Sequence, residues 1–222
     1  MPKNEYNPTF VEMQCGSVTL EGNIFIPSDS IGLVLFVHGS GSSRMSPRNR
    51  FVARMLSQRG LGTLLFDLLT RKEEEIDAIT GHLRFDIMLL SQRLMDATGW
   101  VLKNIQSTNK NLGYFGASTG AAAALVAASQ IPKTVKAIVS RGGRPDLAGS
   151  SLGDVRCPSL FLVGSNDEEV IELNKIAMDK MTAKKKLVII PGATHLFEEP
   201  GKLELVAQYA GDWFSKHLGG HT

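Results

Sequence analysis

A serine between two glycines, in the run Gly116-Ala117-Ser118-Thr119-Gly120, separates an apolar segment from an alanine-rich one. The apolar residues 112–115 are typical of a buried strand, and the alanines from Ala121 onward are typical of a helix. Together they predict a sharp strand-to-helix turn that presents the Ser118 hydroxyl at the edge of a sheet, where it could act as a nucleophile. The glycines matter because bulky neighbours of the serine would collide with the strand and the helix.

A nucleophilic serine needs a base, and the base needs an acid that orients it. Asp167 follows the short apolar run 159–164, and His195 follows the apolar run 187–191. Because ligands of open α/β sheets bind outside the carboxyl ends of the strands, we expect these side chains to meet Ser118 there. We interpret Ser118 as the nucleophile, His195 as the base and Asp167 as the orienting acid.

A glycine-rich stretch upstream, residues 38–43, also follows an apolar run. Backbone N–H groups in such a loop can stabilise a negatively charged oxygen. We expect the N–H groups of Ser40 and of Thr119, the residue after the nucleophile, to form this oxyanion hole. Gly39 is a candidate substrate-binding residue. We interpret His38 as a structural side chain that orders its own loop.

Arg141 and Arg144 follow the strand expected at residues 135–139, so they too belong at the carboxyl edge of the sheet. The planar guanidinium group suits a carboxylate or a phosphate, which makes both arginines candidate substrate-binding residues. The alternative is that they form ion pairs with nearby acids such as Asp146, or hold their loop in place.

Each of these features has a simpler explanation when it is taken alone. Ser118 could be a small residue at a close strand–helix contact, Asp167 could cap a helix, and His195 could be a solvent-exposed loop residue. Their joint occurrence in one order, each after a strand, argues against these explanations. His195 and Glu198 could form a metal-binding pair, but the nearby sequence offers no further ligands. We therefore expect no metal and no cofactor.

Composition sets broad limits on the function. The chain has 222 residues, 43% of them hydrophobic, which favours a single domain that comprises residues 1–222. Its net charge of +2 favours neither a nucleic-acid partner nor a membrane partner. Only Cys15 and Cys157 are cysteines, so we expect no disulfide framework. With no apolar signal core in residues 1–6, we expect a soluble cytoplasmic protein that acts on a small molecule. A homodimer is an open possibility.

Strands and helices alternate after an N-terminal hairpin expected at residues 10–14 and 18–26. Further strands are expected at 33–37, 62–66, 112–115, 135–139, 159–164 and 187–190, and helices at 48–59, 83–106, 121–130, 171–183 and 202–217. We interpret residues 67–81 as a polar connection and Gly99 as a bend within its helix. The roughly 20 residues between Val139 and Leu160 leave no room for an inserted helical cap, so we expect an open active site.

From Val18 to Leu218 the sequence resembles the α/β-hydrolase superfamily, and within it the small dienelactone-hydrolase-like branch. The runs that look closest to one bacterial subgroup are residues 38–43, 66–70, 116–120, 140–147 and 192–197. The resemblance implies a mostly parallel sheet with helices on both faces, an N-terminal antiparallel hairpin and no cap domain. It also implies the triad assignment. Some members of the subgroup look fused to a phosphoribosyltransferase domain, and we identify no such domain in these residues.

One departure from the family bears on the substrate. Dienelactone hydrolases proper use a cysteine nucleophile, whereas this elbow carries Ser118, which favours a serine esterase over hydrolysis of dienelactone. A dehalogenase of this fold would need aspartate there. Thioesterase, lactonase and amidase activities share the same machinery and remain open. The alternative from another class is a non-catalytic binding or regulatory module on a hydrolase scaffold.

Overall fold

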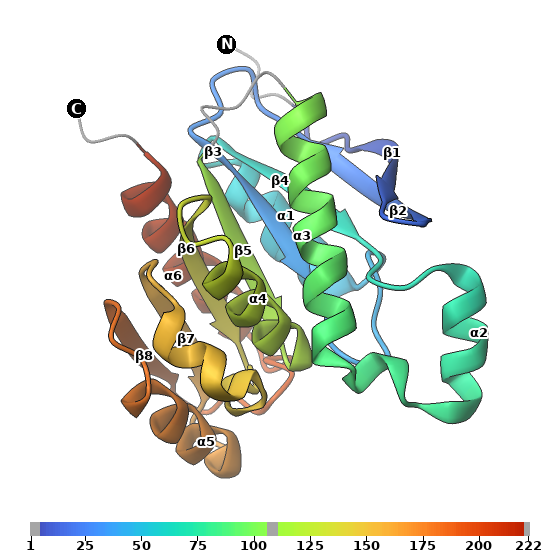
Figure 1. Ribbon diagram of the computed structural model, residues 1–222. Coiled ribbons are helices and arrows are strands. Elements are labelled where there is room, and N and C mark those ends of the chain that lie inside the picture. Colours follow the sequence, from blue (N-terminus) through green and yellow to red (C-terminus); the bar gives the residue numbers. More distant parts are fainter. Residues whose placement is uncertain (1–4, 106–110, 220–222) are drawn as a thin grey trace.

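The computed structural model describes residues 5–105 and 111–219 (Figure 1). Its centre is an eight-stranded sheet in the order β1-β2-β4-β3-β5-β6-β7-β8. The hairpin β1–β2 and the pair β2–β4 are antiparallel, and the other neighbours are parallel. The strands are β1 (Thr9–Cys15), β2 (Val18–Phe25), β3 (Gly32–Val37), β4 (Leu61–Phe66), β5 (Leu112–Ala117), β6 (Val135–Arg141), β7 (Ser159–Gly164) and β8 (Lys185–Ile190).

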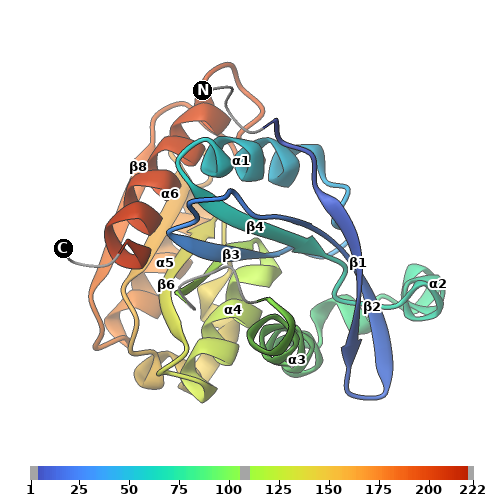
Figure 2. The ribbon, with the colours of Figure 1, turned by 90° about the horizontal axis from the view of Figure 1, so that it is seen from above.

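Helices cover both faces of the sheet, as the view from above shows (Figure 2). Helices α1 and α6 pack on one face, and α3, α4 and α5 pack on the other. The helices are α1 (Pro47–Ser57), α2 (Arg71–Thr80), α3 (Ile87–Asn104), α4 (Thr119–Gln130), α5 (Glu168–Asp179) and α6 (Lys202–Leu218), with 3-10 segments η1 (Leu83–Phe85) and η2 (Pro145–Asp154). The sheet order and the two helical layers confirm the expected α/β-hydrolase fold with its N-terminal hairpin.

The two faces of the central strand β5 explain why its sequence is continuously apolar. Tyr114 belongs to the core under α3 and α4, whereas Phe115 belongs to the core under α1 and α6. Burial on both faces is the usual situation of a parallel strand. The Tyr114 hydroxyl keeps a partner there, Thr98 Oγ1 at 2.7 Å. The site-bearing strand is thus anchored from both sides.

Helix α2 lies in the segment 67–81, which we expected to be a polar connection. Its first turn is a capping box, in which the Thr70 hydroxyl accepts from the Glu73 N–H and the Glu73 carboxylate accepts from the Thr70 N–H. The apolar periodicity failed to indicate this helix because its apolar residues Ile76 and Ile79 are exposed. Helix α2 extends away from the sheet (Figure 1).

Other boundaries differ by a few residues. Helix α3 runs through Gly99 without ending, and Gln106, the expected end of that helix, lies outside the described residues. Helix α5 begins and ends earlier than the expected 171–183, and the chain already enters β8 at Lys185. Between β6 and β7 the described chain forms only the 3-10 segment η2, so no helical cap is inserted there. Over the same described ranges, no helix has the length and apolar character needed to cross a membrane.

Candidate active site

Ser118 occupies a strained turn between β5 and α4, with φ 51° and ψ −124°. A side chain at Gly116 would put its Cβ 2.5 Å from the Ala121 Cα, and one at Gly120 would put it 2.2 Å from the Val37 carbonyl oxygen. Both approaches are far below van der Waals contact, so the close packing of β3, β5 and α4 requires glycine at both positions. The turn therefore has the geometry that the glycine pattern predicts.

Asp167 and His195 are in direct contact, although they come from the loops after β7 and β8. The His195 Nδ1 lies 2.7 Å from the Asp167 Oδ2. Asp167 occupies the N-cap position of α5, yet its side chain makes no capping hydrogen bond. The two loops are tied together by the Asn166 N–H, which donates to the Ala193 carbonyl at 2.9 Å. The Asp167 carboxylate therefore holds the His195 ring and does not cap helix α5.

The Ser118 hydroxyl and the His195 ring share a cavity of about 230 Å³, whose wall also includes Gly39, Ser40 and Arg141. Within the described residues, no hydrogen bond joins the Ser118 Oγ to the ring. The structure thus brings together all three residues of the expected triad: Asp167 contacts His195, and Ser118 and His195 line one cavity.

The glycine-rich loop packs directly on the serine. A Cβ at Gly39 would lie 2.9 Å from the Ser118 Cβ, so only glycine fits there. The Ser40 N–H, which we expected in the oxyanion hole, donates to the Thr119 Oγ1 at 2.9 Å. The Thr119 N–H is the first of helix α4, where backbone N–H groups have no intrahelical acceptor and the helix dipole favours negative charge.

His38 links this loop to the loop after β4. The Leu68 N–H donates to the His38 Nε2 at 3.1 Å, and the Nδ1 lies 3.0 Å from the Gly39 carbonyl oxygen. The two bonds fit one neutral tautomer, in which Nδ1 carries the proton. Burial lowers the pKa of His38, which also favours the neutral ring. These contacts agree with a structural role for this histidine.

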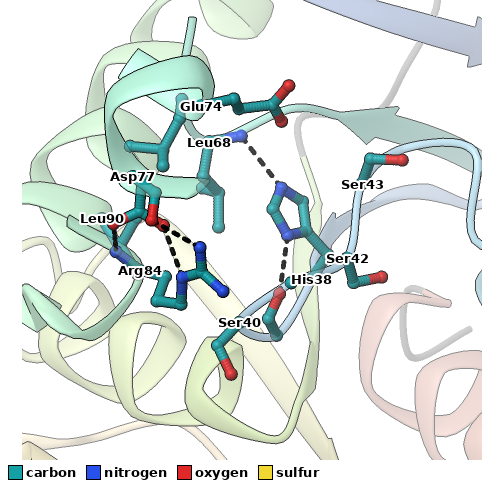
Figure 3. Close-up of a pocket in the computed structure, with 12 residues that line it drawn as sticks. His38, Ser40, Ser42, Ser43, Leu68, Glu74, Asp77, Arg84 and Leu90 are labelled. Atoms are coloured by element: carbon teal, nitrogen blue, oxygen red, sulfur yellow. Dashed lines mark hydrogen bonds and ion pairs between the residues drawn. The ribbon is translucent and has the colours of Figure 1, made fainter. Parts of the chain in front are cut away.

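A second cavity of about 300 Å³ is lined by the glycine-rich loop and by residues of the segment 68–90 (Figure 3). It shares Gly39, Ser40 and Ser42 with the cavity beside Ser118. Figure 3 shows its opposite wall, where Asp77 accepts from the Arg84 Nε at 2.5 Å. Sequence reasoning missed this cavity because it missed α2, although the pair Thr70-x-x-Glu73 was an available signal.

The two candidate arginines have different surroundings. Arg144 forms a two-pronged ion pair with Asp146, from its Nε at 2.9 Å and its Nη2 at 2.8 Å, which supports the ion-pair alternative. Arg141 instead lines the cavity that contains Ser118 and His195. Only Arg141 therefore remains as a candidate for contact with a ligand in that cavity.

Comparison with known proteins shows the family. Residues 22–217 match the model of the dienelactone hydrolase family. A dienelactone hydrolase from Anabaena variabilis is 56% identical, and its crystal structure superposes with a TM-score of 0.92 over 95% of this chain and 98% of that chain. Est1E from Butyrivibrio proteoclasticus is 16% identical and has a TM-score of 0.78 over 95% of this chain and 99% of that chain, which is a likeness of fold.

Two Mycobacterium tuberculosis proteins, each named a putative phosphoribosyl transferase, are 53% identical over 210 residues. The match covers 95% of this chain but 46% of those proteins, so the chain spans about half the length of the curated relatives it matches. Their name therefore describes proteins with a further region of similar size.

Proposed function

Because the chain belongs to the dienelactone hydrolase family, we propose that it is a serine hydrolase that cleaves small carboxylic esters or thioesters through an acyl-enzyme on Ser118. The observation that carries the proposal is the 2.7 Å contact between the His195 Nδ1 and the Asp167 carboxylate, beside a cavity that Ser118 also lines. An imidazole held in this way has one tautomer, with the proton on Nδ1 and a free lone pair on Nε2.

In the proposed first step, the His195 Nε2 takes the proton of the Ser118 hydroxyl while the oxygen attacks the substrate carbonyl. The imidazolium then gives this proton to the leaving alcohol or thiol, and the acyl group stays on Ser118. Water repeats the sequence and releases the acid. Asp167 stabilises the charged ring in both halves of the reaction. The hydrogen bond between hydroxyl and ring forms with substrate present, as is common in enzymes whose free form has longer contacts.

The oxyanion of each tetrahedral intermediate would be held by two backbone donors. The Thr119 N–H has no acceptor within its own helix, and its position at the start of α4 adds the favourable end of the helix dipole. The Ser40 N–H donates to the Thr119 Oγ1 in the free protein, so the oxyanion would take this donor over from a neutral hydroxyl. A charged acceptor forms the stronger hydrogen bond, which favours the exchange.

Ser118→Ala tests the proposal. We expect it to abolish turnover of p-nitrophenyl acetate and covalent labelling by a fluorophosphonate, because no other group replaces the nucleophile. Ser215→Ala, which removes a hydroxyl from α6, serves as the matched control and should leave both unchanged. A Ser118→Ala protein that keeps more than a few per cent of the wild-type rate would refute the assignment. Wild-type protein that neither hydrolyses esters nor takes the label would instead support the binding-module alternative.

A further inference from the structure

Arg141 is the neighbour of the nucleophile across one step of the sheet. It ends β6, where it pairs with Ala117 of β5, and its carbonyl oxygen accepts from the Ser118 N–H at 3.2 Å. Residues two apart on a strand share a face, so the side chain follows Val139 toward the α1 and α6 side. There it lines the cavity of about 230 Å³ together with Ser118 and His195.

Within the part of the chain that the structure describes, the charge of Arg141 has no counterion. The residue is 6% exposed, and its buried Nε and Nη1 have no hydrogen-bond partner. Its Nη2 has a single long contact, 3.5 Å to the Asn49 Oδ1 on α1. Among the described residues, no acidic side chain forms an ion pair with it. Burial, together with the nearby charge of Arg48, lowers the pKa of Arg141 to about 10, so the guanidinium still carries its charge near pH 7.

The other arginines that line the two cavities have ion-pair partners. Arg48, in the same cavity as Arg141, pairs with Glu198. Arg84, in the second cavity, pairs with Asp77. A buried and uncompensated charge is costly, and burial of a charge is ordinarily accompanied by a partner. A side chain that keeps this charge beside a nucleophile therefore indicates that the partner arrives with the ligand.

We propose that Arg141 binds a negatively charged group of the substrate, a carboxylate or a phosphate, so that the preferred substrates are acidic esters. This inference rests on the proposed function, since it places the anion beside the acyl-transfer site. Guanidinium N–H donors suit both kinds of anion, and Arg141 lines the cavity that the ester would enter.

Binding separates this inference from the hydrolase assignment. Calorimetry of the Ser118→Ala protein with succinate and, separately, with inorganic phosphate should detect one bound anion and show which of the two binds more tightly. Adding Arg141→Met should weaken that binding at least ~10-fold, as expected for the loss of a charge-assisted hydrogen bond. Adding Arg144→Gln instead removes an equal charge nearby and should leave it unchanged. Equal binding with and without Arg141, or binding of neither anion, would overturn the inference.

Kinetics give the second arm. The half-ester mono-p-nitrophenyl adipate and p-nitrophenyl hexanoate have acyl chains of equal carbon number and differ by a terminal carboxylate in place of a methyl group. Arg141→Met should lower kcat/KM for the half-ester at least ~10-fold and leave the hexanoate within about threefold, and Arg141→Lys should recover part of the loss. A loss of equal size for both esters in a folded Arg141→Met protein would overturn the inference, since it would place the arginine in support of the site or of the transition state. If anions bind through Arg141 but no ester is cleaved, the hydrolase assignment fails and the anion site stands.

Discussion

Replacing Ser118 by glycine should make the protein more stable than replacing it by alanine, although both variants lose the hydroxyl of the proposed nucleophile. Ser118 has φ 51° and ψ −124°, a combination that glycine adopts freely and that residues with a Cβ avoid. The surroundings fix this conformation, because the Ser118 N–H donates to the Arg141 carbonyl at 3.2 Å and the Ser118 carbonyl accepts from the Arg144 and Ala121 N–H groups at 3.1 Å each. Alanine inherits the strain, and glycine relieves it.

The size of the effect follows from two opposing terms. A residue held in such a region costs ~1–3 kcal/mol. Glycine recovers this amount, but it adds ~0.5–1 kcal/mol of conformational entropy to the unfolded chain. Ser118→Gly should therefore exceed Ser118→Ala in unfolding free energy by about 1 kcal/mol. For a chain of this length the difference corresponds to a rise in Tm of about 2–4 °C.

Urea unfolding followed by circular dichroism measures the difference, and thermal unfolding gives the Tm. The same pair of substitutions at Ser215, inside α6, provides the control. The backbone at Ser215 is helical, so the Ser215→Gly variant should have an unfolding free energy about 1 kcal/mol lower than that of Ser215→Ala. Finding Ser118→Gly less stable than Ser118→Ala, with the control behaving as expected, would refute the claim that strain is stored at Ser118.

Two further predictions concern Asp167 and His38, which lie in the loops around Ser118. Asp167→Asn should reduce kcat/KM for p-nitrophenyl acetate by about 10³–10⁴-fold, because an amide at 2.7 Å from the Nδ1 favours the wrong tautomer of His195; a loss below tenfold would remove Asp167 from its assigned role. Burial lowers the pKa of His38, so as the pH falls the imidazole takes up a proton in the unfolded chain before it does so in the folded protein. The contribution of the neutral ring to the unfolding free energy should therefore be fully present above the pKa of the unfolded chain, about 6.5, and decrease as the pH drops below it. Between pH 7.5 and 5 the unfolding free energy, measured by equilibrium unfolding, should decline less steeply in His38→Gln than in wild type. Identical slopes would contradict the interpretation of His38 as a buried, neutral histidine.

The sequence was sufficient for those parts of the site that rest on short-range signals. The elbow glycines act within two residues of Ser118, and each of Asp167 and His195 directly follows an apolar strand. In a parallel sheet these strands end at one edge, so a local pattern predicts a long-range meeting.

Other features depend on contacts that no local pattern encodes. Helix α2 has a capping signal but no apolar stripe, so its formation depends on caps and on the pairing of Asp77 with Arg84 rather than on burial. The difference between Arg141 and Arg144 depends on where β6 ends. The strand continues to Arg141, which fixes that side chain against the α1 face, whereas Arg144 lies beyond it and reaches Asp146.

Two departures from ordinary stability rules meet at one point of this fold. Ser118 is held in a backbone conformation that costs energy, and the buried Arg141 has no acidic partner among the described residues. The two residues share a backbone hydrogen bond, so both costs lie within one step of the sheet. Sequences tolerate such costs where function depends on them. On the proposed function, we infer that the strain marks Ser118 as the attacking residue, and that the unbalanced charge beside it sets the sign of a group on the substrate.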